Sequence, residues 1–431
     1  MKKQLLSIPF LLIIGRSAGM LIPFVIARAY GAGAHTDAFF WVLSLMTFIA
    51  SVMTYLFESV LVPYLTEHKI ESDSADDFAN AVLLVILPVV LGICLILGGA
   101  LALGVLRFGP SGDNIFLARL FFEMTPFLLL GIWAAQSNGI FYTHQKFSFP
   151  ALSPLFRSLT ILCCIAVLRK TWGIHALAAG YVLGEGLRWG TGLLTLKRMA
   201  CWNLRIRREE VGAEIAEFFR RIGYQLIALI AVNIIFFVDL SFAAQLGEGK
   251  ASLFNYADRL QQVPYLLFQA GFLNIFYSFW AQSFQKESLP IFWGKIRRHT
   301  RAIFAVTFAV SFFLWLTREP LISIVYGREN FSGGQIREIQ SLFGLLCIQL
   351  PAAVMYTLYV RVLFILKSVK LYLGVACFQL GGKIILNFIF AHFYGVQGLA
   401  LSTLVVMGVL ALALHGYLGQ FWKERTGHAA S

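Results

Sequence analysis

The residues of this sequence with the greatest chemical potential are charged side chains inside long apolar stretches. An ionisable group costs roughly 2.5–3.5 kcal/mol when it is inserted at the centre of a membrane helix, so one that is retained there is interpreted first as functional. The charges of this kind are Arg16, Glu58, Glu123, Arg157, Asp239, Asp258, Arg259, Arg361 and Lys383.

Two interpretations of these charges are open. The groups either form ion pairs that hold helices together, as Glu185 and Arg188 could at their helical spacing of three residues, or they line a hydrated cavity. The number of basic groups favours a cavity, because so many would not be buried in lipid without water or an anion. A guanidinium presents a fork of donors that matches phosphate oxygens, so a diphosphate is a natural occupant. The basic groups are Arg16, Arg157, Arg259, Arg361 and Lys383.

No catalytic or nucleotide-binding motif accompanies these charges. The eight histidines are scattered, and HExxH, GxSxG and GxxxxGK[ST] are absent from the sequence. We therefore predict that the protein is not an enzyme and that it has no metal site and no cofactor. Any transport would have to be driven by an ion gradient, the membrane potential or the substrate gradient, which leaves a coupling ion open.

The elements that must position these charges are membrane-spanning helices. Of the 431 residues, 58% are hydrophobic and 13% are charged, whereas a soluble domain has about 25% charged residues. The apolar runs are continuous rather than alternating, which favours helices over a barrel. We predict an all-α integral membrane protein with about 12 spans in two six-helix bundles. The predicted spans are residues 5–28, 39–65, 78–106, 115–142, 149–168, 173–196, 222–246, 253–283, 302–326, 339–366, 371–393 and 396–422.

Basic loops between the spans account for the formal net charge of +13. We interpret this charge as a signal for membrane orientation and not for nucleic-acid binding, because the basic residues do not line an aromatic groove. The richest loop, residues 197–221, has seven lysines and arginines. The positive-inside rule then places this loop and both termini in the cytoplasm. The same loop is predicted to contain a short amphipathic helix at the inner membrane surface.

Internal repetition predicts the domain organisation. The run WGIHALA at 172–178 aligns with YGVQGLA at 394–400, a separation of 222 residues, and TDAF at 36–39 aligns with ADRL at 257–260. Parallel repeats of six helices each are typical of transporters, with the substrate path between the halves. We predict an N-terminal bundle at 1–196, a basic linker at 197–221 and a C-terminal bundle at 222–431.

Several motifs follow one another in order along the chain. They begin with GRSAG at 15–19, ARAYGAG at 27–33 and TDAFF at 36–40, and continue with FNYADRL at 254–260, which is followed by Pro264. Val62-Pro63 and the charged residues after it fit the end of the second span. In this order the motifs resemble the MurJ (MviN) family of lipid II flippases. Length and hydropathy agree with that family over nearly the whole chain.

The resemblance implies a fold and a function. The expected fold is that of the multidrug, oligosaccharidyl-lipid and polysaccharide exporter superfamily, in which two lobes form a V that opens alternately to the two faces of the bacterial cytoplasmic membrane. In the lipid II flippases a cationic cavity receives the diphosphate and sugar head group. The resemblance makes Arg16, Arg28, Asp37 and Arg259, with the neighbouring Asp258, the expected substrate-binding residues.

Within that scheme we expect different roles for these residues. Arg16 and Arg259 would hold the diphosphate, and Arg28 and Asp37 would act as a gate or pair at the outer mouth. Glu58 and Glu123 would be cavity acids. The remaining intramembrane charges would line the cavity or take part in coupling. The expected partners are the lipid-linked glycan, the bilayer, and cell-wall or polysaccharide synthesis enzymes.

The sequence also departs from the family pattern. Ile22-Pro23 stands where an Arg-Asp pair is usual, and the arginine pair of the second span is absent, its region reading FIASV at 48–52. The chain stops near twelve predicted spans, whereas family members typically add two that form a groove for the lipid tail. An exporter of O-antigen or exopolysaccharide units, an ion-coupled multidrug exporter and a non-transporting membrane scaffold therefore stay open as alternatives.

Overall fold

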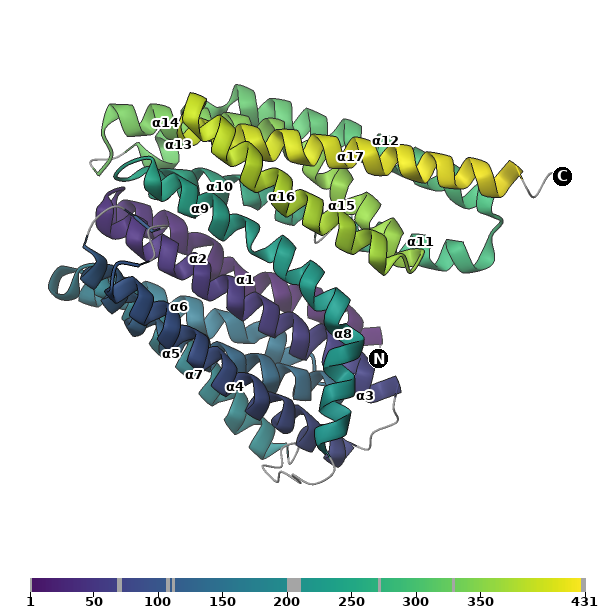
Figure 1. The fold of residues 1–431 in the computed structure, drawn as a ribbon, viewed down its shortest axis with the longest axis horizontal. Helices are drawn as coiled ribbons and strands as arrows, with labels where there is room; N and C mark the ends of the chain where they lie inside the picture. Colours follow the sequence, from purple (N-terminus) through teal and green to yellow (C-terminus); the bar gives the residue numbers. More distant parts are fainter. Residues whose placement is uncertain are drawn as a thin grey trace. The chain divides into compact units, whose positions relative to one another are not determined.

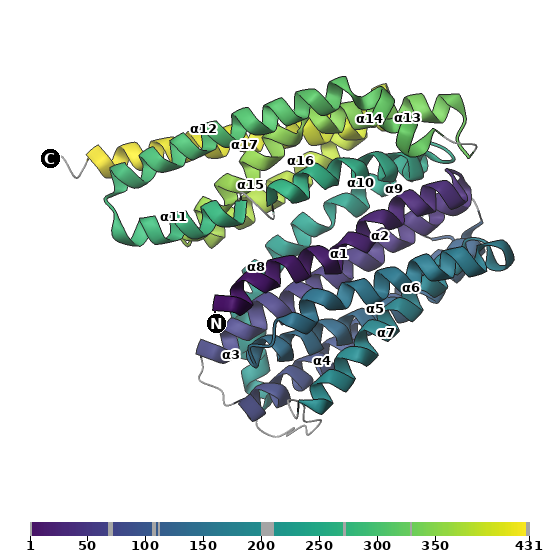
Figure 2. The same cartoon turned by 180° about the vertical axis from the view of Figure 1, so that it is seen from behind.

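The computed structural model describes residues 2–67, 72–105, 109–110, 113–199, 211–269, 273–327 and 330–427. Within these ranges the regular structure is helical and contains no β-strand, which confirms the predicted all-α fold (Figures 1 and 2). The helices group into two compact units. Unit 1 comprises Met1–Leu226 and Gly247–Gly249, and unit 2 comprises Ile227–Leu246 and Lys250–Ser431.

Unit 1 is a bundle of long helices that lie side by side (Figures 1 and 2). The second predicted span changes from α-helix to one π-helical turn, η1, and back to α-helix. Tyr64 and Phe78 contact Phe218, which lies on the first part of α8 (Val211–Asn233). The helices of unit 1 are α1 (Lys2–Tyr30), α2 (Ala34–Tyr55), η1 (Leu56–Leu61), α3 (Val62–Glu67), α4 (Ser72–Ala102), α5 (Asn114–Thr143), α6 (Ser148–Trp172) and α7 (His175–Arg198).

Unit 2 contains more broken helices than unit 1. Its core includes Trp280, Phe292, Tyr356 and Trp422, which come from four different helices. The helix α8 begins in unit 1 and ends in unit 2. The helices are α8 (Val211–Asn233), α9 (Ile235–Gln245), α10 (Lys250–Phe268), α11 (Asn274–Lys286), α12 (Leu289–Leu316), α13 (Arg318–Tyr326), α14 (Gly333–Ile348), α15 (Leu350–Ile365), α16 (Val369–Tyr394) and α17 (Val396–Gly427).

Each predicted span coincides with one helix or with consecutive helices. Among the described residues, eight helical segments are long and apolar enough to cross a membrane, and the pair α14 and α15, bent by 40°, makes a ninth. The other three predicted spans correspond to α1, α7 and the pair α10 and α11. These three segments carry Arg16, Glu185, Arg188 and Arg259, so they include much of the candidate site.

Large apolar side chains on the outer faces identify the surface that meets lipid. Ile96 on α4 and Phe388 on α16 are each 73% exposed. Because an aqueous surface of this kind would be unfavourable, the exposure fits helices that face hydrocarbon. The protein is therefore a multi-pass membrane protein.

The predicted linker lies only partly within the described residues. Residues 200–210 are outside them, and residues 211–221 form the beginning of α8 rather than a separate short helix. Glu217 and Arg221 form an ion pair of 2.5 Å on this part of α8. The charged sequence is thus continuous with the helix that was predicted as the seventh span.

Glycines allow two helices to pack closely against α6. On α1, Gly15 and Gly19 lie four residues apart, and a Cβ at Gly15 would be 2.1 Å from a backbone oxygen of α6. On α7, Gly180 and Gly184 have the same spacing, and a Cβ at Gly184 would be 2.8 Å from the backbone oxygen of Arg157. Small residues at this spacing let backbones approach in membranes, where packing drives helix association. The contacts fix α6, and with it Arg157, between α1 and α7.

We expect Gly184→Ala to lower the free energy of unfolding by about 1–3 kcal/mol, because the added methyl group forces α7 away from α6. The matched control is Gly190→Ala on the same helix, where a Cβ meets nothing within 4 Å. Thermal unfolding of the purified proteins in detergent measures the difference. Equal stability of the two variants would contradict the expectation.

Candidate functional site

A charge cluster in unit 1 is organised around Glu185 on α7. The carboxylate accepts hydrogen bonds from Arg157 on α6 at 3.3 Å and from Arg188 at 2.8 Å. Its side chain is only 1% exposed, so the two guanidinium groups provide the charge compensation that a buried carboxylate requires. Arg188 also donates to the hydroxyl of Ser153 at 3.2 Å. The pairing of Glu185 with Arg188 confirms the interaction suggested by their spacing.

Glu58 lies on the π-helical turn η1. Its carboxylate accepts a hydrogen bond of 2.7 Å from the side-chain amide of Asn138 on α5. The next residue, Gly139, allows η1 and α5 to approach closely, because a Cβ there would be 2.8 Å from the backbone oxygen of Phe57. Single π-helical turns inside α-helices occur frequently at functional sites. Here the turn presents an acid to a polar position on α5.

Arg16 is the least engaged of the predicted basic groups. It is exposed on α1, and it makes no hydrogen bond or ion pair with the part of the chain that the structure describes. Arg16 and Arg188 both attract the carboxylate of Glu58. The unit 1 charge cluster, defined as Arg16, Glu58, Arg157, Glu185 and Arg188, therefore contains three cations and two anions. Arg16 is the exposed arginine of this cluster, whereas Arg157 and Arg188 both bond to Glu185.

Asp37 stabilises a turn that closes unit 1. It is 1% exposed, and its carboxylate accepts a 2.6 Å hydrogen bond from the backbone N–H of Gly249. Gly249 adopts a φ of +81°, which glycine reaches without the steric cost that a Cβ would bring. Arg28 is exposed in the last turn of α1. The role of Arg28 and Asp37 as a gate stays a prediction.

The two predicted cavity acids do not share a site. Glu123 accepts a hydrogen bond of 3.0 Å from Arg119 and contacts His175 at 2.5 Å. On α5 it lies fifteen residues before Asn138, the partner of Glu58, which corresponds to about 22 Å along a helix. Glu123 is therefore part of a separate polar contact at the beginning of α5 and α7.

In unit 2, the predicted residues Asp258 and Arg259 are linked by a neighbour on α10. Gln262 donates to Asp258 at 2.6 Å and accepts from Arg259 at 3.1 Å. The guanidinium of Arg259 also lies 4.9 Å from the ring centroid of Phe236 on α9, within the range of a cation–π interaction. These contacts hold the guanidinium without an ion pair in the described structure. Arg259 thus resembles Arg16 in lacking a fixed carboxylate partner.

Arg361 lies near an aromatic and hydroxyl-rich surface of unit 2. On α15, its guanidinium is 5.9 Å from the ring centroid of Tyr277. One turn earlier, Thr357 shares a hydrogen bond of 2.9 Å with the hydroxyl of Tyr265, which belongs to α10. The surface that extends from Arg259 along α10 therefore continues onto α15 as a series of polar groups.

Lys383 and Asp239 form a buried ion pair inside unit 2, with 3.0 Å between Nζ and Oδ1. Their side chains are 1% and 6% exposed. The interpretation of the intramembrane charges as ion pairs therefore applies to Lys383 and to Arg157, because each has a carboxylate partner. Arg16 and Arg259 fit the interpretation as anion-binding groups better.

Sequence reasoning missed several polar neighbours of the predicted residues. Each of them could have been found from its helical spacing or its polarity within an apolar run. Gln262 follows Asp258 by four residues, and Asn138 stands in the apolar stretch of α5. The residues added by the structure are Asn138, Ser153, Gln262, Tyr265 and Thr357.

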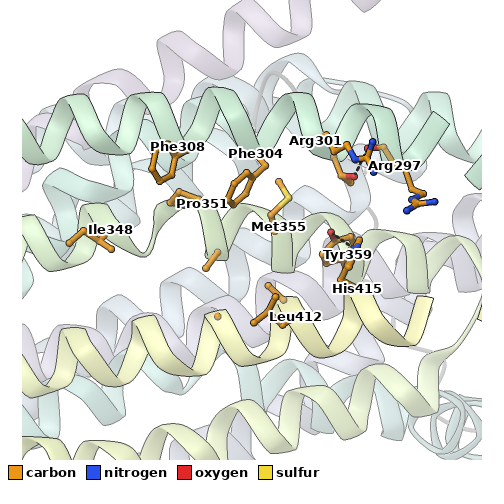
Figure 3. Close-up of a pocket in the computed structure, with 14 residues that line it drawn as sticks. Arg297, Arg301, Phe304, Phe308, Ile348, Pro351, Met355, Tyr359, Leu412 and His415 are labelled. Carbon is orange, nitrogen blue, oxygen red and sulfur yellow. Dashed lines mark hydrogen bonds between the residues drawn. The ribbon is translucent and has the colours of Figure 1, made fainter. Parts of the chain in front are cut away.

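A separate pocket of about 630 Å³ lies within unit 2, between α12, α15 and α17 (Figure 3). Arg297 and Arg301 lie at one end of it, and Phe308 and Ile348 lie at the other. Guanidinium groups beside an apolar lining suit an amphiphile with an anionic head group. None of the predicted site residues lines this pocket.

Comparison with known proteins places these features in a family. The chain matches the sequence model of the family described as "Lipid II flippase MurJ" over residues 26–426. It is 24% identical to the probable lipid II flippase MurJ of Vibrio cholerae over 91% of this chain and 78% of that protein. It is 22% identical to the lipid II flippase MurJ of Burkholderia cenocepacia over 93% of this chain and 80% of that protein.

Solved structures share the fold. A lipid II flippase MurJ in an inward closed conformation matches with a TM-score of 0.84 and 20% identity, covering 96% of this chain and 87% of that chain. An inward-facing multidrug resistance transporter of the MATE family matches with a TM-score of 0.80 and 16% identity, covering 97% of each chain. The family match extends over nearly all of the sequence and includes most of the motifs at 15–40 and all of those at 254–260. The chain therefore belongs to the lipid II flippase MurJ family.

Proposed function

We propose that this protein is a flippase that moves a polyprenyl-diphosphate-linked glycan precursor from the cytoplasmic to the outer leaflet of the bacterial cytoplasmic membrane. The observation that carries the proposal is Arg16, an exposed guanidinium inside a membrane helix, which gives the unit 1 charge cluster its excess positive charge. A diphosphate supplies the anion that such a group requires. Membership of the flippase family supports the same substrate class.

In this proposal each unit carries a guanidinium that can bind diphosphate oxygens. These are Arg16 in unit 1 and Arg259 in unit 2, because neither forms an ion pair with a carboxylate within the described structure. Glu185 holds Arg157 and Arg188 in place, so that they support the site electrostatically. Gln262 orients Arg259 through its hydrogen bond. The hydroxyl and aromatic groups near Arg361 are suited to a sugar.

The proposed mechanism is alternating access, in which the binding site opens first to one face of the membrane and then to the other. Both termini lie in the cytoplasm in this scheme, as the distribution of basic loops predicts. Energy comes from an ion gradient, the membrane potential or the substrate gradient. The precursor is supplied and consumed by enzymes of cell-wall or surface-polysaccharide synthesis.

A second candidate function is ion-coupled export of cationic drugs. The structural similarity to a multidrug resistance MATE family transporter favours it. A cavity for cations requires an excess of acids, whereas the unit 1 charge cluster has one more arginine than carboxylates and Asp239 is already paired with Lys383. The charge balance therefore favours the lipid-linked anion.

Reconstitution tests the proposal directly. The purified chain is placed in liposomes that contain fluorescent lipid II, an undecaprenyl-diphosphate-linked oligosaccharide without peptide, or a fluorescent phospholipid. A membrane-impermeant quencher measures the fraction of each lipid that becomes accessible. We expect faster exposure of at least one diphosphate lipid than in protein-free liposomes, and no change for the phospholipid.

Comparison of the two diphosphate lipids identifies the glycan. Preference for lipid II indicates a peptidoglycan precursor, and preference for the peptide-free lipid indicates another surface glycan. Export of a cationic dye without exposure of either diphosphate lipid would reject the proposal in favour of the multidrug function. Failure with all substrates in a well-folded preparation would favour a scaffold that does not transport.

A further inference from the structure

The ammonium group of Lys383 lies in an unusually complete oxygen cage. Its Nζ donates to the backbone oxygen of Leu399 at 3.0 Å, to the hydroxyl of Ser402 at 2.8 Å and to the hydroxyl of Thr403. The carboxylate oxygen of Asp239 is also 3.0 Å away. These four oxygens come from α9 and α17, whereas the lysine reaches them from α16.

The number of oxygens exceeds the number of hydrogen-bond donors. An ammonium group has three N–H bonds, but here four oxygens surround one nitrogen. Such convergence is expected around a spherical cation, whose attraction has no preferred direction. Carboxylate, carbonyl and hydroxyl oxygens are also the hard ligands that bind alkali and alkaline-earth ions.

A second layer of hydrogen bonds holds the oxygens in position. Asn387, one turn after Lys383 on α16, donates to Asp239 at 2.7 Å and accepts from the hydroxyl of Ser402. Asn387 and Ser402 are fully buried. Groups that ligate a cation are commonly oriented by such outer contacts. The cage is therefore preorganised by residues other than the lysine.

We propose that Lys383 is a tethered cation that occupies a monovalent-cation site formed by α9, α16 and α17. The chain carries the charge itself, so no exchangeable ion binds at this position in the native protein. The oxygen cage retains the capacity to bind a free monovalent cation when the ammonium is removed. Asp258 also interacts electrostatically with Lys383 and Asp239, so the fixed charge contributes to the surroundings of Arg259.

Salt-dependent stability of the purified full-length chain tests this inference independently of transport. The thermal midpoint is measured in sodium, potassium, methylammonium or choline chloride at equal ionic strength. Choline is too large for the cage and controls for screening. We expect the native protein to have the same midpoint in all four salts, because its site is already filled.

Substitution of Lys383 should make the thermal midpoint depend on the cation. Lys383→Ala is expected to lower the midpoint in choline and to recover it saturably in at least one of the small cations, since a ligand stabilises only the folded state that binds it. Lys383→Met fills the volume without a charge and should not recover. The matched control is Lys250→Ala, which removes a partly exposed lysine that bonds to Glu338 at 2.6 Å and should show no difference among the cations.

Two results would overturn the inference. One is a folded Lys383→Ala protein whose midpoint does not depend on the cation. The other is a native protein stabilised by sodium or potassium in a manner that Asp239→Asn abolishes, because an exchangeable ion would then bind beside the lysine. If the Lys383→Ala protein does not accumulate, the measurement on the native protein still applies. In addition, the double variant that combines Asp239→Asn with Lys383→Met must then be more stable than the single variant Lys383→Met.

Discussion

Replacing Glu185 with alanine should lower the free energy of unfolding of the protein by about 3–5 kcal/mol, the cost typical of removing one partner from a buried ion pair. The reason is that Glu185 forms ion pairs with both Arg157 and Arg188 while its own side chain is 1% exposed. Without it, two guanidinium groups repel each other in a site of low polarity. Denaturant or thermal unfolding of the purified protein in a mild detergent measures the loss.

A solvent-exposed ion pair provides the control for this effect. Glu319 is 68% exposed and lies 3.6 Å from Arg318, so Glu319→Ala should change stability by no more than about 1 kcal/mol. Replacing Glu185, Arg157 and Arg188 together with leucine or methionine should recover much of the lost stability, because the uncompensated charges disappear. Equal losses for Glu185→Ala and Glu319→Ala would contradict the structural role assigned to Glu185.

Arg16→Ala and Arg259→Ala should each slow exposure of the diphosphate lipid by roughly tenfold or more, because each removes charge-assisted hydrogen bonds worth about 1.5–3 kcal/mol. Neither guanidinium forms an ion pair with a carboxylate within the described residues, so its removal breaks no ion pair there. Protein abundance and thermal midpoint should therefore stay near those of the native protein. The liposome assay with the impermeant quencher measures the rate.

A lysine at either position separates charge from geometry. Arg16→Lys and Arg259→Lys keep the positive charge but lose the bidentate fork, so their rates should fall between those of the native and alanine proteins. Arg119→Ala, which removes a largely exposed arginine of α5 that pairs with Glu123, controls for loss of a basic residue elsewhere. Unchanged transport in both alanine variants would remove these arginines from the proposed diphosphate site.

The sequence was sufficient to predict the helical framework. Apolar runs placed each predicted span on one helix or on consecutive helices, because continuous hydrophobicity of this length requires a satisfied helical backbone in lipid. The match of TDAFF and FNYADRL to the flippase family was confirmed by the family comparison over residues 26–426. The π-helical turn at Glu58 was not predicted, because nothing in the composition of residues 56–61 separates it from α-helix.

Side-chain partners could be predicted only where they are close in sequence. Glu185 and Arg188 were expected to pair because three residues separate them, whereas Arg157 joins them from another helix. The contacts of Lys383 with α9 and α17 likewise depend on tertiary packing. Hydropathy alone therefore identified charges in the membrane but did not decide which ones were neutralised.

The glycine contacts on both sides of α6 restrict where unit 1 can deform. The backbones at these glycines are closer than a methyl group would permit, so sliding of α1 or α7 along α6 would bring larger residues into steric overlap. These three helices should consequently move as one rigid body during a transport cycle. Flexing is then left to segments outside these three helices, of which η1 is the natural hinge, since π-helical turns are places where helices kink.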